Sequence, residues 1–491
     1  MKKTVVLYPG LFVSHFVPML QLADAFLDAG YAVTVALIDP SLKQGIAFGA
    51  VVDRVASSNP SIAFHTLPPI PDPPAMTHDP QFIVRYLDLV SRYTQHLHDL
   101  LCSMPPGSVH ALVVDVVSTD ALDAARKLGI PAYIFLPSNA SALAMSFQVS
   151  SSTRAECQPS FKEMGDAPLH LHGVPPVPAS HLFAELLEDP ESEVYKTMVH
   201  VLGRCGGPES NGILVNTFVS LEARAVGALG DRDCFPGMPP VYCVGPLVAG
   251  GSSGGEARGK EHECLAWLDE QPDRSVVFLC FGSVGAGNHS KDQLMEIAAG
   301  LEKSGHRFLW VVRASPPPED EPENKPLFDP RADPDLDALL PDGFLERTTG
   351  RGFVVKLWAP QVDVLHHRAT GAFVTHCGWN SALEGIMAGV PMICWPLYAE
   401  QKMNKVFVVV EEYGVGVEMV GWRDGMVRAK EVEAKVRLVM GESEEGNRIR
   451  ARVMEHRDAA AVAWEEGGSS RAAFGRFLLV GLQLGAVLSS V

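Results

Sequence analysis

The side chains best suited to chemistry gather after a short apolar strand that ends at His376. A tight turn follows, and Asn380 and Ser381 then open a helical segment. The first N–H groups of a helix have no partner within the helix, and the helix dipole favours negative charge there. With the three polar side chains, this pattern predicts a site for a diphosphate held without a metal ion. The alternative is that Asn380 and Ser381 only cap the helix, as these residue types often do.

Further polar and aromatic residues flank this turn. Glu384, one helical turn further on, could accept hydrogen bonds from ribose hydroxyls. Trp358 offers a flat face to a nucleobase, with backbone groups of Ala359 at its edge, although tryptophans more often pack in cores. Glu400 and Gln401 come just after another apolar strand and could bind sugar hydroxyls. The combination predicts a nucleotide-sugar site.

A second pair of residues suits general-base chemistry. His15 follows the first apolar strand, in the predicted loop, and Asp115 lies near the end of a later strand. In a doubly wound sheet ordered 3-2-1-4-5, these strands are neighbours, and their carboxyl ends bring the two side chains together. A carboxylate beside an imidazole fixes its tautomer and stabilises the imidazolium. Asp120 is an alternative orienting residue, but it also fits as the charge at the start of a helix.

The elements that must position these residues alternate between strand and helix along the whole chain. Apolar, β-branched runs separated by helical patterns indicate parallel sheets covered on both faces. Ligands bind beyond the carboxyl ends of such strands, so we expect the active site in the cleft between two domains. The predicted fold class is α/β, with two doubly wound Rossmann-like domains facing each other. They are an N-terminal domain over residues 1–248, a Gly- and Ser-rich linker over 249–261, a C-terminal domain over 262–460, and a helical segment over 461–491 that packs back on the N-terminal domain.

Composition limits the classes of partner. The chain has 491 residues and a net charge of −18, which disfavours nucleic acid and anionic membranes as partners. Its nine cysteines are scattered without a Cys-x-x-Cys pair, which is typical of reduced thiols in a cytoplasmic protein. The uncharged stretch 477–491 is shorter than the ~20 residues that span a bilayer. We expect a cytoplasmic monomer with no stable membrane insertion.

Two features resemble metal sites without predicting one. Residues 333–337 read Asp-Pro-Asp-Leu-Asp, but they lie in a Pro-rich acidic stretch that is typical of a solvated surface loop. His366 and His367 are adjacent on a predicted helix, with no carboxylate or cysteine at metal-ligand spacing. We therefore expect neither a metal ion nor another cofactor.

The segment from Trp358 to Gln401 resembles the complete C-terminal signature box of plant family 1 UDP-dependent glycosyltransferases. The stretches HCGWNS and WPLYAEQ are its most specific parts. The resemblance extends over nearly the full chain and includes GILVNTF, FGSVG and SGHRFLWVVR. It implies the GT-B fold, inversion of anomeric configuration and no metal requirement. The nearest subgroup glucosylates flavonoids, chalcones, anthocyanidins and other phenolics.

The resemblance also implies roles for individual donor-site residues. Gln401 ends the box, where glutamine generally accompanies UDP-glucose and histidine is often associated with UDP-galactose. Trp379 stands where some glucuronosyl-transferring relatives carry arginine, so both positions favour glucose. The implied contacts are Trp358 and Ala359 with uracil, Gln361 and Glu384 with ribose, His376, Asn380, Ser381 and Ser283 with the diphosphate, and Trp379, Glu400 and Gln401 with the sugar.

In the first domain, the resemblance implies that His15 is the general base and Asp115 its orienting partner. The family usually has glycines before this histidine, as in G-x-G-H, whereas this chain carries Phe12 and Ser14. The added bulk affects the expected shape of the acceptor more than the role of the base. The acceptor pocket is expected from loops of the first domain, with Phe12, Phe16, Phe82, Tyr86, Ser138, Phe147 and Phe183 as candidate acceptor-binding residues.

These observations predict an inverting glucosyltransferase that moves glucose from UDP-glucose to a hydroxyl of a phenolic small molecule such as a flavonoid or a chalcone. Its only partners would be the UDP-sugar and the aglycone. Two alternatives stay open. The acceptor could be a terpenoid, a hormone or a xenobiotic, or an aromatic carbon that forms a C-glycoside. The chain could also be a nucleotide-sugar-binding protein that has lost catalysis.

Overall fold

The computed structural model forms two compact units. The first contains residues up to 249 together with residues 462–491, and the second contains most of the chain between residues 250 and 461. The predicted linker, residues 249–261, lies outside the described residues. The structure describes residues 2–39, 52, 55–57, 59–76, 80–151, 159–207, 209–248, 262–282, 289–313, 333–409 and 413–488.

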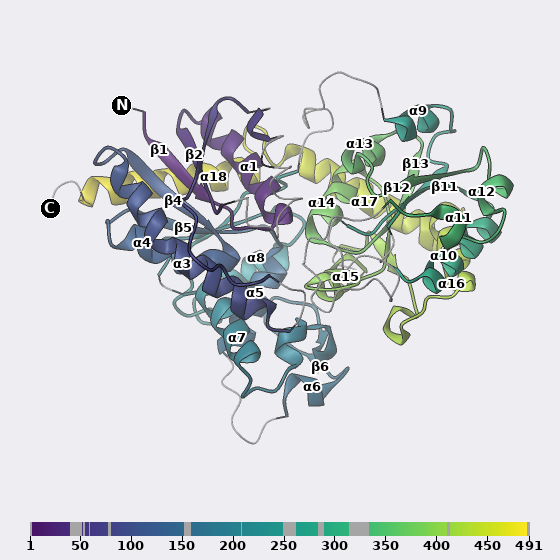
Figure 1. Ribbon diagram of the computed structural model, residues 1–491, viewed down its shortest axis with the longest axis horizontal. Coiled ribbons are helices and arrows are strands. Elements are labelled where there is room, and N and C mark those ends of the chain that lie inside the picture. The colour runs from purple at the N-terminus through teal and green to yellow at the C-terminus, as the bar shows by residue number, and fades with distance from the viewer. Residues whose placement is uncertain are drawn as a thin grey trace. The chain divides into compact units, whose positions relative to one another are not determined.

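The first unit is built on a parallel sheet in which the first and fourth strands are neighbours (Figure 1). Successive residues of a strand point to opposite faces, so β1 serves two layers. Val5 and Leu7 lie in a core shared with the first and last helices of the chain, whereas Tyr8 lies near Tyr86 and Tyr93. The strands, in sheet order, are β3 (Ile62–Thr66), β2 (Ala32–Leu37), β1 (Thr4–Tyr8), β4 (Val109–Asp115), β5 (Ala132–Leu136), β8 (Ile213–Val215) and β9 (Val241–Cys243).

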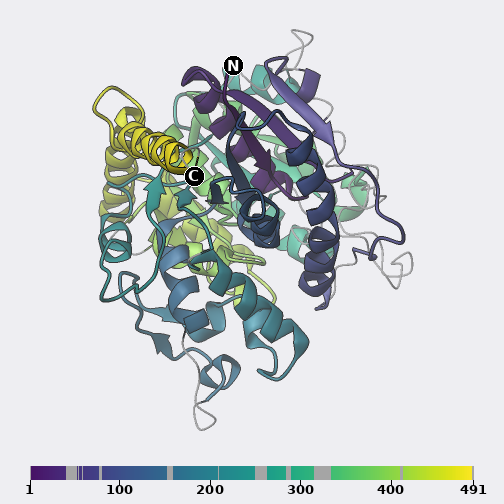
Figure 2. The ribbon, with the colours of Figure 1, turned by 90° about the vertical axis from the view of Figure 1, so that its left-hand side faces the viewer.

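The helices of the first unit include the C-terminal one, α18 (Ser469–Leu488), which packs beside β9 and β4 (Figures 1 and 2). Its Phe474 and Phe477 contact Phe26 of α1, with ring centroids 5.2 and 5.8 Å apart. The described residues contain no helix long and apolar enough to cross a membrane. The other elements are α1 (Val13–Asp28), α3 (Phe82–Ser103), η1 (Val116–Ala121), α4 (Leu122–Arg126), α5 (Ala140–Ser151), α6 (Phe161–Met164), β6 (Pro168–Leu169), β7 (Val177–Pro178), η2 (Ala179–His181), η3 (Ala184–Leu187), α7 (Glu193–Cys205) and α8 (Ala223–Leu229).

The second unit repeats the plan with a parallel sheet of its own (Figure 1). Val277 and Leu279 of its central strand pack against apolar residues of α10 and α16. Phe278 points to the other face and stacks on Phe373, with ring centroids 5.3 Å apart. The strands, in sheet order, are β12 (Gly352–Lys356), β11 (Arg307–Val312), β10 (Val276–Cys280), β13 (Thr370–Thr375), β14 (Met392–Cys394) and β15 (Gly416–Glu418).

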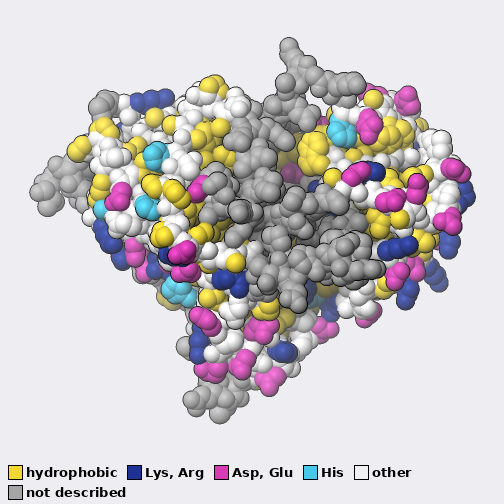
Figure 3. All heavy atoms as spheres, in the orientation of Figure 1, with side chains coloured by type: hydrophobic (Ala, Val, Ile, Leu, Met, Phe, Trp, Pro, Cys, Tyr) yellow, Lys and Arg dark blue, Asp and Glu magenta, His cyan; other side chains and the backbone are white. Residues whose placement is uncertain are grey.

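The helices of the second unit follow its strands. The strand order 3-2-1-4-5 predicted for the first unit is confirmed, and the second unit has the predicted parallel sheet, although the short strands β6, β7 and β15 were not predicted. On the face shown in Figure 3, Lys and Arg side chains are scattered among Asp and Glu. The helices are α9 (Glu263–Asp269), α10 (Lys291–Ser304), α11 (Leu336–Leu339), α12 (Phe344–Arg347), α13 (Gln361–His366), α14 (Trp379–Ala388), α15 (Gln401–Val409), η6 (Trp422–Asp424), α16 (Ala429–Met440) and α17 (Glu444–Val462).

A buried carboxylate holds the start of α5 in the first unit. Glu222 is fully buried, and its carboxylate accepts hydrogen bonds from the N–H groups of Ala140 (2.8 Å) and Ser141 (3.0 Å) and from the Ser141 hydroxyl (2.8 Å). The Asn139 side chain accepts a further bond from Ala142 N (2.7 Å). A negative charge at a helix N-terminus also interacts favourably with the helix dipole. Glu222 therefore fixes the segment that carries two predicted acceptor-site residues.

Replacing this carboxylate should destabilise the protein. In Glu222→Gln one acceptor oxygen becomes an NH₂ group that faces N–H donors, so we expect a loss of about 2–4 kcal/mol in the free energy of unfolding. Chemical denaturation of the purified protein measures it. The exposed Glu188→Gln is the control and should change stability by less than about 0.5 kcal/mol. Equal unfolding midpoints for the two variants would contradict this role of Glu222.

Candidate active site

The segment after β1 requires a glycine and places His15 on a helix. Gly10 has φ +65°, and a Cβ atom on it would lie 2.4 Å from the hydroxyl oxygen of Tyr86. Phe12 then takes the N-cap position of α1, where its carbonyl accepts hydrogen bonds from His15 N (3.0 Å) and Phe16 N (2.9 Å). His15 therefore lies in the first turn of α1. The prediction that it lies in a loop was wrong, because α1 already begins at Val13.

The structure brings His15 and Asp115 together. Asp115 ends β4, the neighbour of β1, and its Oδ1 lies 2.9 Å from His15 Nδ1. The Asp115 side chain is fully buried, whereas the His15 side chain is 24% exposed. The second carboxylate oxygen accepts a hydrogen bond from Val117 N (3.3 Å). A carboxylate at Nδ1 favours the tautomer with the proton on that nitrogen, which leaves the lone pair on Nε2.

The alternative partner, Asp120, faces other residues. Its carboxylate lies 3.6 Å from Arg204 Nε and 3.9 Å from His200 Nε2, both on α7. Asp120 lies in η1, whereas the carboxylate beside His15 is that of Asp115. The alternative that Asp120 orients His15 was therefore wrong.

Three of the predicted acceptor-site aromatics form a cluster beside His15. The Phe12 ring lies 5.2 Å from the His15 ring, 4.9 Å from Tyr86 and 6.0 Å from Phe82, between centroids. Phe12 and Phe82 are half-buried, but Tyr86 is 1% exposed. The Tyr86 hydroxyl accepts a hydrogen bond from Leu11 N (3.3 Å), and burial, with the charge of Asp115, raises the pKa of Tyr86. Tyr86 is therefore a buried residue that supports Phe12, and not an exposed part of a pocket wall.

The other four predicted acceptor-site residues differ in burial and in their neighbours. Phe16 is fully buried in the core with the β1 residues, so its placement in a pocket was wrong: it lies on the sheet-facing side of α1. Phe147 of α5 lies 5.4 Å from Phe235, between ring centroids. Phe183 is half-buried just before η3, and Ser138 is half-buried before α5.

In the second unit, the strand β13 ends in the predicted tight turn. Cys377 has φ +66°, a strained value for a residue with a Cβ, and its carbonyl accepts a hydrogen bond from the Asn404 side chain (3.0 Å). Gly378 is the N-cap of α14 and forms no side-chain cap. Asn380 and Ser381 lie inside the first turn of the helix. The capping alternative for these two residues was therefore wrong.

Three predicted donor-site residues form one hydrogen-bonded cluster. The Gln361 side-chain nitrogen, from the start of α13, donates to Ser381 Oγ (2.9 Å) and to Glu384 Oε2 (2.6 Å). Both acceptors lie on α14, one turn apart. Burial raises the pKa of Glu384 to about 7, and the bond from Gln361 opposes this shift. Near neutral pH the carboxyl group therefore exists in both protonation states.

His376 is one of the buried polar groups of this region. It is 7% exposed, and Cβ atoms placed on Gly282 or Gly378 would lie 2.6 Å from its Nε2. Its Nδ1 is buried and has no hydrogen-bond partner among the described residues. Burial, together with the positive charge of Arg313, lowers the pKa of His376 to about 4. The imidazole is therefore neutral at pH 7 and offers a hydrogen bond rather than a charge.

Arg313 is a residue that the sequence analysis missed. It follows β11, and its Nε donates a hydrogen bond to the carbonyl oxygen of Leu357 (2.6 Å). Leu357 has φ +65° and directly precedes Trp358. The Nη1 atom of Arg313 is buried without a partner in the described part of the chain. Trp358 is 45% exposed, and its ring meets the His262 edge at 5.9 Å, whereas Ala359 is 5% exposed. A charged residue directly after the apolar run of β11 was the signal available in the sequence.

The predicted sugar-binding residues have uneven access. Trp379 is 2% exposed and its ring packs 6.4 Å from that of Tyr413, so the side chain itself is enclosed. Gln401 is 2% exposed, and its Oε1 accepts hydrogen bonds from Leu397 N (2.9 Å) and Tyr398 N (3.0 Å). Only the amide nitrogen of Gln401 then remains as the donor suited to a sugar. Glu400 lies beside it at the start of α15, half-buried.

The other predictions concern Ser283 and the two apparent metal motifs. Ser283 lies outside the described residues. Asp335 caps α11, where it accepts hydrogen bonds from two backbone N–H groups, and Asp333 pairs with Lys356 (2.9 Å). His367 Nε2 lies 3.1 Å from Asp269 Oδ1. The acidic and histidine motifs thus have structural partners.

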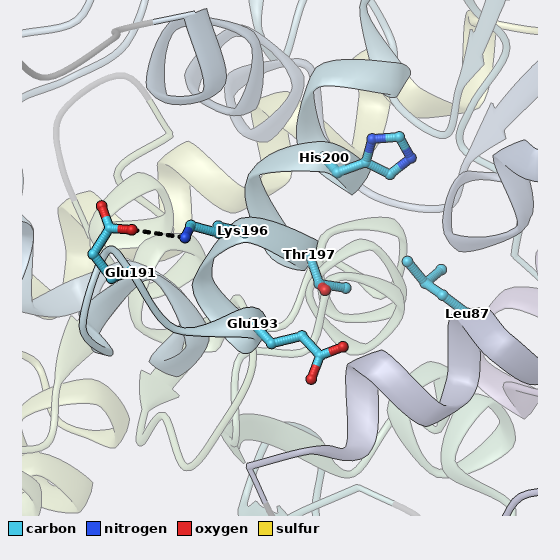
Figure 4. Close-up of a pocket in the computed structure, with 6 residues that line it drawn as sticks. All are labelled: Leu87, Glu191, Glu193, Lys196, Thr197 and His200. Carbon is cyan, nitrogen blue, oxygen red and sulfur yellow. Dashed lines mark hydrogen bonds and ion pairs between the residues drawn. The ribbon is translucent and has the colours of Figure 1, made fainter.

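A hollow of about 460 Å³ lies between α3 and α7 in the first unit (Figure 4). Glu191 and Lys196, which form an ion pair (2.7 Å), line it with Leu87, Glu193, Thr197 and His200. None of the predicted site residues is among them. Its wall is charged and has no Phe, Tyr or Trp ring, so it does not suit a flat apolar acceptor.

Known proteins resemble both units together. The family model described as UDP-glucoronosyl and UDP-glucosyl transferase matches residues 248–443. An anthocyanidin 5,3-O-glucosyltransferase from a Rosa hybrid cultivar is 39% identical, over 96% of this chain and 97% of its own. A Polygonum tinctorium UDP-glucosyltransferase capable of glucosylating indoxyl, solved with 3,4-dichloroaniline, shares 37% identity and a TM-score of 0.82, over 98% of this chain and 99% of its own. A Medicago truncatula protein solved with UDP-glucose shares 29% identity and a TM-score of 0.79, over 98% of each chain.

The raised pKa of Glu384 predicts that donor affinity depends on pH. If its ionised carboxylate accepts from ribose hydroxyls, the ionised fraction rises from about one tenth at pH 6 to about nine tenths at pH 8, so UDP-glucose should bind up to about tenfold more tightly at pH 8. Calorimetry measures it with UDP-glucose, whose diphosphate has no titration in this range. Glu384→Gln should bind UDP-glucose with nearly the same affinity at pH 6 and at pH 8. A wild-type affinity that falls as pH rises would contradict the assignment.

Proposed function

The chain belongs to the plant UDP-glycosyltransferases, and from this premise we propose that it is an inverting glucosyltransferase with His15 as its general base. The observation that carries the proposal is the 2.9 Å contact between His15 Nδ1 and the buried Asp115 carboxylate. This contact sits at the carboxyl ends of β1 and β4, where doubly wound sheets place reacting groups. A nucleotide-sugar-binding protein without catalysis would have no need of such a pair.

In the proposed reaction, His15 Nε2 accepts the proton of the acceptor hydroxyl. The acceptor oxygen forms a bond to the anomeric carbon of glucose from the face opposite UDP, and the bond from that carbon to the diphosphate oxygen breaks. Asp115 stabilises the imidazolium that results. A phenol suits this step because its pKa near 10 is well below that of an alcohol.

The donor is proposed to bind the second unit at the end of β13. Trp358 offers its exposed ring to uracil, and the cluster of Gln361, Ser381 and Glu384 accepts the ribose and part of the diphosphate. Gln401 would donate from its amide nitrogen to glucose, since its carbonyl oxygen already holds the backbone at Leu397 and Tyr398. Glucose as the sugar is part of this proposal.

The leaving diphosphate is proposed to be stabilised without a metal ion. The N–H groups at the start of α14 and the unpartnered Nδ1 side of His376 provide hydrogen bonds, and Arg313 supplies positive charge to the region. Carboxylates that could hold a divalent ion are not gathered around His376 among the described residues. The chemistry of this donor set is that of an anion site.

Removing the base should impair turnover and leave donor binding intact. For His15→Ala we expect kcat on a weakly acidic phenol to fall about 10²–10⁴-fold, because general-base catalysis typically contributes that much. UDP affinity should stay within about twofold of wild type, since the proposed donor contacts lie in the second unit. Steady-state kinetics with a UDP-release assay, and calorimetry with UDP, measure the two quantities. Near-normal turnover would show that His15 is not the base.

Chelation should leave the activity unchanged. Exhaustive treatment with EDTA removes divalent ions but no hydrogen-bond donor of the proposed diphosphate site, so kcat should be retained. The same assay after adding back Mg²⁺ or Mn²⁺ is the control. Activity that disappears on chelation and returns with either ion would overturn the metal-free mechanism.

A further inference from the structure

An aromatic cluster flanks the base on one side. Phe12 lies 5.2 Å from His15, between ring centroids, at an interplanar angle of 44°. Phe82, from the start of α3, meets the edge of Phe12 at 6.0 Å and 64°. Both phenylalanines are half-buried, so part of each ring remains accessible beside the 24% exposed His15 side chain. The cluster therefore presents apolar ring surface next to the nitrogen that takes the proton.

Tyr86 keeps Phe12 from turning away. The Tyr86 ring stacks on the Phe12 ring at 4.9 Å and 27°, which is the offset arrangement that aromatic pairs favour. Tyr86 is itself fixed, because it is 1% exposed and its hydroxyl contacts the Gly10–Leu11 backbone. Phe12 is also fixed from its backbone, as the N-cap of α1. Phe12 is thus held both by the Tyr86 ring and by its own backbone, so the wall that Phe12 and Phe82 form beside His15 has a defined shape.

The chemistry of this wall distinguishes classes of acceptor. A flat ring can stack against Phe12 and Phe82 while its hydroxyl reaches His15, whereas a puckered saturated ring of equal size has no flat face to offer. The Phe12 ring lies beside His15 whichever acceptor is bound, so any effect of this contact on the base is common to all acceptors. Selection among acceptors and support of the base are thus separable effects of the same side chain.

We propose that Phe12 is a specificity-determining residue, which with Phe82 selects flat aromatic acceptors over saturated ones beside His15, and that Tyr86 is the positioning residue that holds it. This inference rests on the proposed function and deepens it, because it assigns the acceptor class to a particular wall. It also gives a physical role to the bulky residue at position 12.

The test compares two phenols of matched size, 2-naphthol and 5,6,7,8-tetrahydro-2-naphthol, which differ in whether the second ring is flat. For wild type, Phe12→Leu and Phe12→Tyr, the ratio of kcat/KM for the two acceptors is measured with UDP-glucose. We expect wild type and Phe12→Tyr to prefer 2-naphthol, and Phe12→Leu to lose about two- to tenfold of that preference. Comparing ratios between variants cancels the different acidities of the two phenols.

Two further variants distinguish a change in acceptor preference from a general loss of folding or activity. Phe64→Leu, a half-buried phenylalanine of β3 in the same unit, should keep the wild-type ratio. Tyr86→Leu, which removes the ring that stacks on Phe12, should lower the preference for 2-naphthol as Phe12→Leu does, with UDP-glucose binding unchanged. A wild-type ratio in an active Phe12→Leu enzyme would overturn the inference while leaving the proposed function standing. Failure of wild type to glucosylate either naphthol would instead contradict the proposed function.

Discussion

The hydrogen-bonded contact between His15 and Asp115 is the interaction on which the rest of the first unit depends. It exists because β1 and β4 are adjacent parallel strands whose carboxyl ends coincide. It is maintained by a turn at Gly10 that admits no side chain and by the early start of α1 at Phe12. Asp115 is fully buried, and its carboxylate is stabilised by His15 and by the backbone N–H of Val117. The strands, the turn and the aromatic support therefore together position His15, the proposed proton acceptor.

The second unit contains the groups proposed to hold the leaving UDP, whose diphosphate gains negative charge as the bond to glucose breaks. They are backbone N–H groups at the start of α14, a neutral buried His376, and the positive charge of Arg313. A neutral imidazole and peptide dipoles need no reorganisation as negative charge develops, which is the condition under which fixed donors lower a barrier most. Asn404 and Gln401 stabilise the surrounding loops, because the side chain of each forms hydrogen bonds with backbone groups near the site.

The sequence was sufficient for the parallel sheets, for the pairing of His15 with Asp115 and for the turn after His376. Each follows from strand periodicity and from the rule that parallel strands end at one edge. Other features depend on which face of a helix is buried, and this is decided by distant residues. Phe16 entered the core and Tyr86 became a support for that reason. Arg313 was missed because a charged residue after a strand is usually solvated. The hydrogen bonds that the Gln401 side-chain carbonyl accepts from backbone N–H groups also have no signal in the sequence.

The most direct measurement of the central claim is the turnover of Asp115→Asn. The asparagine fits the same space, but its NH₂ group can donate to His15 Nδ1 and so favours the tautomer with the proton on Nε2, which cannot act as a base. Steady-state kinetics on a weakly acidic phenol, with thermal unfolding and UDP-glucose calorimetry as controls, give the answer. The account predicts a kcat about 10²–10⁴-fold lower with donor affinity preserved. A folded Asp115→Asn enzyme with near wild-type kcat would contradict it.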